Sequence, residues 1–330
     1  MRIFSGIQPT GDKHLGNYSG GFRQYALTQA EGEGFFCIVD LHSITVDYEP
    51  EALRRTSLDL AAMLFATGLD PERSTVFLQS HVGAHAEAAW LLSSVTSVGQ
   101  LGRMIQFKDK GDAQEFVSAG LFGYPVLMAG DILLYQTDLV PIGDDQRQHL
   151  ELARDVAERF NSRFGETFRV PAARFPEIGA RIMDLQDPAK KMSTTGGSPQ
   201  GTVLIADPPD TVRKKIRSAV TDSGSDVVHD REAKPGVSNL IEIMSVATGE
   251  PFAAIEARYD GGGYGRFKAD VAEAVVALLD PIRGRYDELR GDEGELARLL
   301  AVGAAKAREA SAPTLAAMYE RMGFVRASIA

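Results

Sequence analysis

An apolar run in the first third of the chain sets the strongest limit on the fold. The run FFCIVDLHSIT occupies residues 35–45, and its first five residues are all apolar. A strand with this pattern is buried on both faces, as in the middle of a parallel sheet that helices cover on both sides. We therefore expect residues 35–45 to form a central parallel strand.

The segments around this run alternate between strand and helix patterns. Residues 3–8 and 74–80 have strand patterns, and residues 14–29 and 50–67 have helical ones. This βαβαβ order predicts a doubly wound sheet whose ligands bind at the carboxyl ends of the strands.

The rest of the chain divides into a sheet-forming part and a helical part. The patterns are helical at 84–138 and 144–161, and strand-like at 139–143 and 179–185. From about residue 208 onward only helical spacing is present. We expect an α/β fold with a doubly wound parallel-sheet, Rossmann-like domain at residues 1–195, which carries the helical insertion around 84–138. An all-helical domain follows at residues 196–330.

Composition excludes several classes of protein. The single cysteine, Cys37, excludes a disulfide framework and a CxxC metal site. The net charge of −10 excludes a basic footprint over the whole surface but leaves room for local basic patches. No uncharged apolar run reaches the roughly 18 residues of a membrane span. Pro9 comes too early in the chain for a signal peptide. We expect a cytoplasmic chain that does not span a membrane.

A glycine-rich segment, GIQPTGDKHLGN, lies between the first strand and the first helix. Gly6, Gly11 and Gly16 let the backbone approach a ligand closely, and the helix N-terminus favours phosphate. The segment is neither a Walker A loop nor a GxGxxG motif. By itself it could equally be a turn without a ligand.

The arrangement GIQPTG followed by HLGNYSG resembles the nucleotide-binding signature of the class I aminoacyl-tRNA synthetases, in the form found in the tryptophanyl and tyrosyl branch. The resemblance implies that His14, Gly16 and Asn17 pack against ATP, with Asn17 in place of the last histidine of the general form. It also implies that Gln8, Pro9 and Thr10 wrap the adenosine and the phosphates.

The second signature of that family, KMSKS, has a counterpart in KKMSTT at residues 190–195. A lysine on a mobile loop can close over phosphates and meet the charge that builds on leaving pyrophosphate. The resemblance implies ATP contacts from Lys191, Met192, Ser193, Thr194 and Thr195, and catalytic roles for Lys191, Ser193 and Thr194 besides His14 and Asn17. Thr194 stands where the family usually has its second lysine.

The stretch YPVLMAGDILLYQTDLVPIGDDQRQH resembles the tryptophanyl-tRNA synthetase family almost continuously. In that family the aspartate of this segment, here Asp131, accepts the indole N–H. The chemistry supports an acid independently, because indole has one donor and no acceptor. Asp131 could alternatively be an N-cap or a solvated residue. The other positions that match the tryptophan pocket are Phe4, Gly6, Gln8, His42, Met128, Val140 and Ile142, with Gln106 as a further polar candidate. Val140 and Ile142 could also be sheet core, and His42 a loop histidine.

Further matches concern ATP. Gly143, Asp144 and Asp145 follow a strand end and match the contact with the ribose, with Gln146 nearby, and Ile182 matches the contact with adenine. The paired aspartates could instead bind magnesium or cap the following helix.

The resemblance implies an enzyme that uses ATP and Mg²⁺ to convert L-tryptophan to tryptophanyl-adenylate and then charges tRNA(Trp). It also implies a homodimer whose helical domain reads the anticodon. Candidate basic patches for the tRNA are Arg103, Lys108 and Lys110; Lys190 and Lys191; and Arg213, Lys214, Lys215 and Arg217. Alternatives are a tyrosine-specific enzyme of the same fold and a regulatory or specialised second-copy paralogue. A nicotinamide dehydrogenase is disfavoured by the missing GxGxxG motif.

Overall fold

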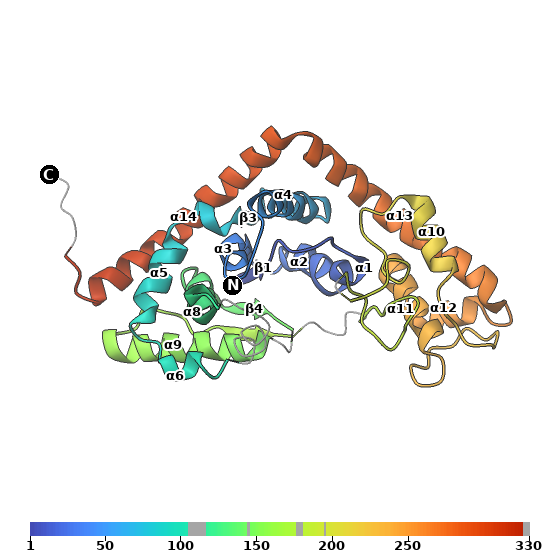
Figure 1. Ribbon diagram of the computed structural model, residues 1–330, viewed down its shortest axis with the longest axis horizontal. Coiled ribbons are helices and arrows are strands. Elements are labelled where there is room, and N and C mark those ends of the chain that lie inside the picture. The colour runs from blue at the N-terminus through green and yellow to red at the C-terminus, as the bar shows by residue number, and fades with distance from the viewer. Residues whose placement is uncertain (105–116, 144–145, 176–180, 195, 326–330) are drawn as a thin grey trace.

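The computed structural model describes residues 1–104, 117–143, 146–175, 181–194 and 196–325. Its centre is a sheet in which every pairing of neighbouring strands is parallel (Figure 1). The strands are β1 (Arg2–Ile7), β2 (Glu33–Ile38), β3 (Ser74–Leu78), β4 (Leu139–Pro141) and β5 (Ala172–Arg174). They lie in the order β3-β2-β1-β4-β5. The expected doubly wound parallel sheet is confirmed.

The central strand is shorter than the apolar run that predicts it. β2 ends at Ile38, and the short helix α3 (Asp40–Ser43) follows. The carboxylate of Asp40 accepts the backbone N–H groups of Leu41 and Ser80, at 3.1 and 2.9 Å. This acid turns the chain out of the sheet, so the second half of the run lies at the sheet's carboxyl edge.

The last strand of the sheet is not where the sequence pattern places it. The prediction of a strand at 179–185 is wrong for its described part, residues 181–185, and β5 at Ala172–Arg174 forms the edge instead. The backbone of Met183 exchanges hydrogen bonds with the side-chain amide of Asn239, at 2.8 and 2.9 Å. Those backbone groups are therefore not available to extend the sheet.

The predicted helical segments are confirmed over the residues that the structure describes. After β1 come α1 (Leu15–Asn17), a π-helical turn (Tyr18–Phe22) and α2 (Arg23–Thr28). The other helices of the first half are α4 (Pro50–Ala66), α5 (Ala84–Ser93), α6 (Val98–Leu101), α8 (Ala119–Leu133) and α9 (Arg147–Phe164). Those of the second half are α10 (Pro209–Arg217), α11 (Pro235–Thr248), α12 (Phe252–Arg258), α13 (Gly263–Gly291) and α14 (Glu293–Arg321).

Alternate side chains of β2 supply two separate cores on the two faces of the sheet. Phe36 and Ile38 pack in a cluster with residues of α4, α11 and α13. Phe35 and Cys37 pack in a second cluster with residues of α5, α8 and α9. The apolar run is continuous because both faces of this strand are buried.

The long helix α14 covers the edge strand β3 and takes part in both cores (Figure 1). Leu299 and Leu300 join the first cluster, whereas Ala304 and Ala307 join the second. Between them, Gly303 meets the strand so closely that a Cβ atom there would lie 1.8 Å from the carbonyl oxygen of Val76. The helix thereby covers an edge on which another strand could otherwise pair.

The strand order creates a switch point between β1 and β4. The chain runs from β1 outward through β2 to β3, and then returns to the other side of β1 at β4. In open α/β sheets the ligand crevice lies at such a point, outside the carboxyl ends of the strands. In the described part of the chain, no helix combines the length and apolar character needed to cross a membrane. The domain boundary at residue 195 stays a prediction.

The contact between Gly303 and β3 leads to a stability prediction. Gly303→Ala should lower the free energy of unfolding by about 1–3 kcal/mol, because the added methyl group forces helix and strand apart. Gly284, in the open middle of α13, has no atom within 4 Å of a built Cβ. Gly284→Ala is the matched control and should raise that free energy by about 1 kcal/mol. Urea unfolding of both variants tests this, and equal effects would contradict the close approach.

Candidate active site

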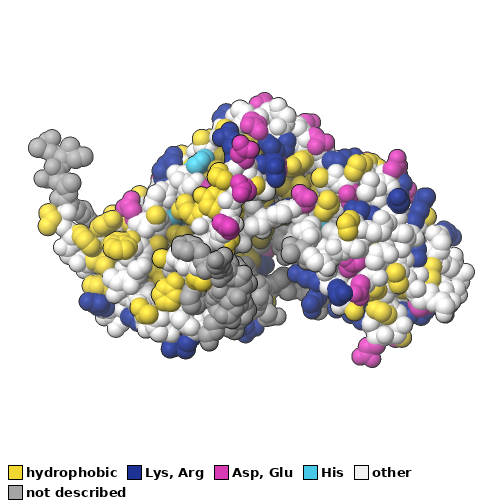
Figure 2. Space-filling model, in the orientation of Figure 1, with side chains coloured by type: hydrophobic (Ala, Val, Ile, Leu, Met, Phe, Trp, Pro, Cys, Tyr) yellow, Lys and Arg dark blue, Asp and Glu magenta, His cyan; other side chains and the backbone are white. Residues whose placement is uncertain are grey.

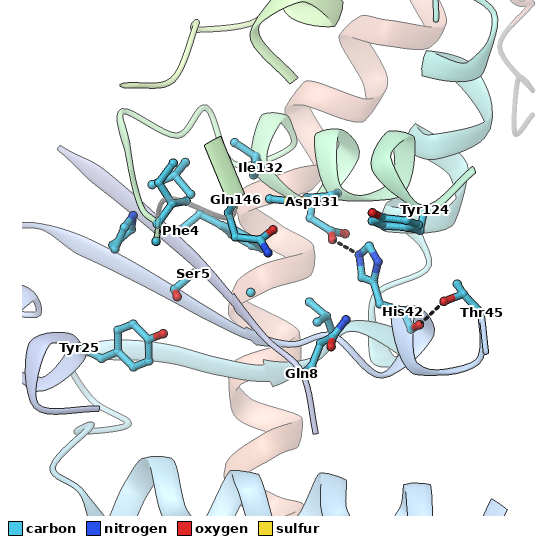
Figure 3. A pocket seen from close by; sticks show the side chains of 17 residues that line it. Phe4, Ser5, Gln8, Tyr25, His42, Thr45, Tyr124, Asp131, Ile132 and Gln146 are labelled. Carbon is cyan, nitrogen blue, oxygen red and sulfur yellow. Dashed lines mark hydrogen bonds and ion pairs between the residues drawn. The ribbon is translucent and has the colours of Figure 1, made fainter. Parts of the chain in front are cut away.

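A pocket of about 520 Å³ lies at the switch point between β1 and β4 (Figure 3). Its volume falls in the usual range for small-ligand sites. All the predicted tryptophan-site residues that the structure describes line it: Phe4, Gly6, Gln8, His42, Met128, Asp131, Val140 and Ile142. They come from β1, α3, α8, β4 and the loops after the strands, so tertiary structure brings together residues far apart in the chain.

The carboxylate of Asp131 is the most buried charge in the pocket wall, with the residue 1% exposed. One oxygen, Oδ2, accepts a hydrogen bond from His42 Nε2 at 2.9 Å. The other, Oδ1, accepts from Gln79 Nε2 at 2.7 Å and from His85 Nδ1 at 2.6 Å. Figure 3 shows His42 reaching Asp131 across the pocket. The N-cap alternative for Asp131 is wrong, because the residue lies in the last turn of α8.

The environment keeps Asp131 ionised. Burial by itself raises the pKa of a carboxyl group, but the hydrogen bonds from His42 and His85 outweigh it and hold the pKa of Asp131 at about 2. Oδ1 accepts two hydrogen bonds and Oδ2 accepts one. Because a carboxylate oxygen can accept two hydrogen bonds, Oδ2 can accept one more from a ligand. The pocket therefore offers an anionic acceptor to a ligand with a single N–H donor.

Polar groups surround the apolar part of the pocket. Gln8 and Gln146 present amides to the cavity, and Tyr124 presents its ring beside His42 (Figure 3). The Tyr124 hydroxyl lies 2.6 Å from Nε2 of the buried His149. Burial raises the pKa of Tyr124 to about 12, so the phenol stays neutral. Neutral donors and acceptors of this kind can hold the ammonium and carboxylate of an amino acid.

The first loop is braced by its own side chains. Nζ of Lys13 donates to the backbone carbonyl of Thr10 at 2.6 Å, which holds the turn around Gly11. His14 Nδ1 accepts the Gly16 N–H at 3.1 Å, and Asn17 Oδ1 accepts the His14 N–H at 3.0 Å. The two side chains thus cap the start of α1 reciprocally.

Burial and nearby charges determine the protonation of His14, and the cap determines its tautomer. Burial, then the charges of Lys191 and Lys13, lower the pKa of His14 to about 4. The ring is therefore neutral near pH 7, and because Nδ1 accepts a hydrogen bond, its proton resides on Nε2. The cap leaves His14 with one N–H donor for a ligand.

The second loop folds onto the first. Met192 N–H donates to the carbonyl of Ile182 at 3.1 Å, within a short antiparallel pairing of Met183 with Lys191. Ile182 lies beside Gly16, where a built Cβ would be 3.8 Å from the Ile182 Cβ. A Cβ on Gly11 would be 3.3 Å from the Thr194 hydroxyl. The two predicted ATP-binding segments are therefore neighbours.

A smaller pocket of about 280 Å³ adjoins this region. It is lined in part by Gln8, Pro9, Thr10 and Gly11 and shares Gln8 and His42 with the larger pocket. Gly143, another predicted ATP contact, lines the larger pocket. Lys191 and Thr194 are exposed, whereas Met192 is buried and Ser193 half-buried.

Several predicted residues lie outside the described residues or are placed differently from the expectation. Asp144, Asp145, Thr195, Gln106, Lys108 and Lys110 lie outside the described residues. The prediction that Lys215 belongs to a basic surface patch is wrong, because its ammonium is buried against Asp207 at 2.7 Å. Its neighbour Arg213 is paired with Glu273 at 2.8 Å. Lys214 and Arg217 remain exposed on α10.

Sequence reasoning missed the residues behind Asp131. Gln79 directly follows β3, so it lies at the carboxyl edge of the sheet, as the pocket does. This position could have indicated that Gln79 belongs to the site. His85 lies on α5, where a histidine in an apolar helix indicates a buried polar contact. Tyr135 is four residues after Asp131, the spacing of one helical turn. Within the described residues, no cluster of His, Cys, Asp or Glu is arranged to hold a metal ion.

Comparison with known proteins relates this geometry to a family. Residues 1–280 match the family model for "tRNA synthetases class I (W and Y)". The chain is 53% identical over 328 residues to the tryptophan–tRNA ligase of Leifsonia xyli subsp. xyli, an alignment that covers 98% of this chain and 97% of that protein. It is 52% identical over 324 residues to the tryptophan–tRNA ligase of Listeria monocytogenes serotype 4b, covering 98% of each.

Solved structures agree with these relatives. The tryptophanyl-tRNA synthetase of Campylobacter jejuni, in complex with ADP and tryptophan, superposes with a TM-score of 0.85 at 38% identity and covers 98% of this chain and 100% of that one. The tyrosyl-tRNA synthetase of Aeropyrum pernix shares the fold with a TM-score of 0.66 at 22% identity, covering 91% of this chain and 89% of that one.

The lowered pKa of His14 leads to a pH prediction. The unfolded chain takes up a proton at His14 near pH 6.5, but the folded chain does so only near pH 4. Acid between these values therefore favours the unfolded state. His14→Asn keeps an N-capping side chain without this titration. From pH 7 to pH 4 the native protein should lose more stability than this variant, as measured by urea unfolding. Parallel pH curves for the two proteins would contradict the assignment.

Proposed function

The chain belongs to the class I tRNA synthetases of the tryptophan and tyrosine group, and we infer from that membership that it activates L-tryptophan and charges tRNA(Trp). The tryptophan carboxylate attacks the α-phosphorus of ATP, and pyrophosphate leaves. A hydroxyl of the terminal ribose of tRNA then attacks the carbonyl carbon of tryptophanyl-adenylate, and AMP leaves. No covalent bond to the enzyme is required, so the protein acts by positioning and by charge stabilisation.

The observation that carries the choice of amino acid is the buried Asp131 carboxylate in the wall of a pocket that also has apolar side chains. Indole is a large apolar ring with one N–H, which matches apolar walls and a single anionic acceptor. Phe4, Val140 and Ile142 supply such walls. We propose that the indole N–H donates to Oδ2 of Asp131. The polar groups of Gln8, Tyr124 and Gln146 would then hold the amino acid's ammonium and carboxylate.

ATP would lie across the two neighbouring loops. Neutral His14 offers its Nε2–H, the braced backbone around Gly11 offers amide groups, and Ile182 beside Gly16 offers an apolar contact for adenine. Mg²⁺ would bind oxygen atoms of the ATP phosphates. When bound, it neutralises part of the phosphate charge.

Lys191 is the cation best placed to meet pyrophosphate. It is exposed on the second loop, and its charge contributes to the lowered pKa of His14, so it lies within electrostatic reach of the first loop. Its neighbour Lys190 is bound to Asp187 at 2.9 Å. Thr194 offers only a hydroxyl, which stabilises anionic charge less than an ammonium does. We propose that Lys191 and the backbone N–H groups of the loop carry the contact with leaving pyrophosphate.

The tRNA requires positive charge outside the pocket. Lys214 and Arg217 are exposed on α10. We propose that this side of the helical part contacts tRNA, and that residues 196–330 form the domain that reads the anticodon. We propose that the enzyme charges tRNA for protein synthesis in the cytoplasm.

An exposed apolar surface supports a homodimer. Trp90 on α5 is 79% exposed, and Val98, the first residue of α6, is 73% exposed. Hydrophobic side chains also gather where α5 and the end of α14 lie in Figure 2. Contiguous apolar surface of this kind marks interaction sites on proteins. We propose that a second copy of the chain covers it.

The proposed activity has a direct test. The purified protein should exchange pyrophosphate into ATP when tryptophan and Mg²⁺ are present, and it should charge only tRNA with a tryptophan anticodon. The control offers each of the other amino acids separately. Exchange that is faster with tyrosine than with tryptophan would assign the chain to the tyrosine-specific branch.

The role of Lys191 can be separated from that of its neighbour. Lys191→Ala should lower kcat for adenylate formation about 10²- to 10³-fold, the usual loss of an electrostatic contact made in the transition state. Lys190→Ala removes an equally exposed lysine that is already paired with Asp187, and should change kcat by less than about threefold. Rapid-quench measurement of adenylate tests both.

Thr194→Lys completes that test. If Lys191 and the loop backbone already carry the contact, the added lysine should change kcat by less than about tenfold. A nearly silent Lys191→Ala, or a gain of several hundredfold from Thr194→Lys, would show that this compensation does not exist.

A further inference from the structure

Asp131 is held from behind by side chains that do not line the pocket. Gln79 and His85 both bind Oδ1, and neither is part of the pocket wall. Both residues are 0% exposed. A substrate in the pocket therefore meets Asp131 but not these two groups. Their contacts can affect the substrate only through the carboxylate.

The network continues from His85 to Tyr135, beside the C-terminal helix. Nε2 of His85 lies 2.8 Å from the hydroxyl of Tyr135, and the side chain of Ser311 on α14 lies near that hydroxyl. Tyr135 and Ser311 are each 0% exposed. A continuous buried chain of hydrogen bonds thus runs from Tyr135 through His85 to the wall of the pocket.

The order of donors along this chain follows from the charge on Asp131. An ionised carboxylate only accepts, so His85 must donate its Nδ1–H to Oδ1. When the ring is neutral, Nε2 accepts, and the Tyr135 hydroxyl donates to it. The contact to Tyr135 thereby fixes the tautomer in which His85 can hold the carboxylate.

Aromatic packing prevents this chain from rearranging. The Tyr135 ring stacks on Phe35 with centroids 4.5 Å apart and on Phe4 with centroids 5.6 Å apart. Phe77 lies 5.8 Å from the His85 ring. Side chains packed in this way stay in one rotamer. The Tyr135 hydroxyl and the His85 ring are therefore fixed relative to α8, which carries Asp131.

We propose that His85 is the positioning residue for substrate recognition. It binds Oδ1 of Asp131, fixes the plane of the carboxylate and leaves Oδ2 turned toward the N–H of the substrate. Tyr135 in turn holds the tautomer of His85. The inference rests on the proposed function, because it takes Asp131 as the group that recognises indole. Its consequence is selectivity: loss of His85 should weaken recognition of the N–H more than binding of the ring.

The experiment compares tryptophan with benzothienylalanine, an analogue in which sulfur replaces the indole N–H. Amino-acid-dependent pyrophosphate exchange gives kcat/KM for each, and their ratio measures recognition of the N–H. His85→Leu removes the donor to Asp131. His85→Asn keeps a donor at the position of Nδ1 but loses the contact to Tyr135. Tyr135→Phe removes one hydroxyl and keeps the packed ring.

A matched control comes from a second histidine–carboxylate pair. His229 Nε2 lies 2.8 Å from the buried carboxylate of Glu242, which is on α11. Both residues are far in sequence from those that line the pocket. His229→Leu breaks that pair in the same way as His85→Leu. It should lower stability without changing the ratio for the two substrates.

His85→Leu should lower the ratio about tenfold or more, mainly through KM for tryptophan, as expected when a hydrogen bond to a charged group is lost. His85→Asn should restore most of the ratio, and Tyr135→Phe should give an intermediate value. A ratio that stays native in Tyr135→Phe, and also in His85→Leu if it folds, would overturn the proposal.

The outcomes separate this inference from the proposed function. No exchange with tryptophan in the native protein would refute the function itself. A ratio that is unchanged in Asp131→Asn would refute the role of Asp131 in recognition. A ratio that falls in Asp131→Asn but stays native in all the His85 and Tyr135 variants would refute only the positioning role of His85.

Discussion

The buried carboxylate of Asp131 is the constraint around which the site is organised. An isolated anion at this depth would be costly, so it needs several donors. His42 from α3, Gln79 after β3 and His85 from α5 supply them. Each of these elements must therefore hold its position relative to α8. The hydrogen bonds that offset the cost of burying this charge also keep the Asp131 carboxyl group ionised. The pocket can therefore bind a ligand that has a hydrogen-bond donor.

The sheet places this carboxylate where a nucleotide can also bind. The order β3-β2-β1-β4-β5 opens a crevice between β1 and β4, and the pocket lies there. The glycine-rich loop leaves the carboxyl end of β1, so the segment that we propose to bind ATP starts at the edge of the pocket that we propose to bind the amino acid. Gln8 lies where the two cavities meet and lines both of them. Reaction between the two substrates needs this adjacency.

The helices after residue 195 are part of the support for the site. Asn239 on α11 binds the backbone of Met183, which pairs with Lys191 of the second loop. Ser311 on α14 lies near Tyr135 behind the pocket, and Gly303 of the same helix packs against β3. The second loop and the back of the pocket are thereby connected to the helical half of the chain.

Local sequence determined the strands β1 to β4 and most helices, and it predicted the residues that line the pocket. The apolar run at 35–45 predicts a doubly buried strand because burial on both faces leaves a pattern in the run itself, and the motifs around His14, Asp131 and Lys191 are contiguous. Only the tertiary structure decided the position of β5, since Met183 is withdrawn from the sheet by Asn239. It also decided that Lys215 is buried and that Gln79, His85 and Tyr135 stand behind Asp131. These contacts join residues far apart in the chain, and a hydrogen bond between distant side chains leaves no periodic pattern in either local sequence.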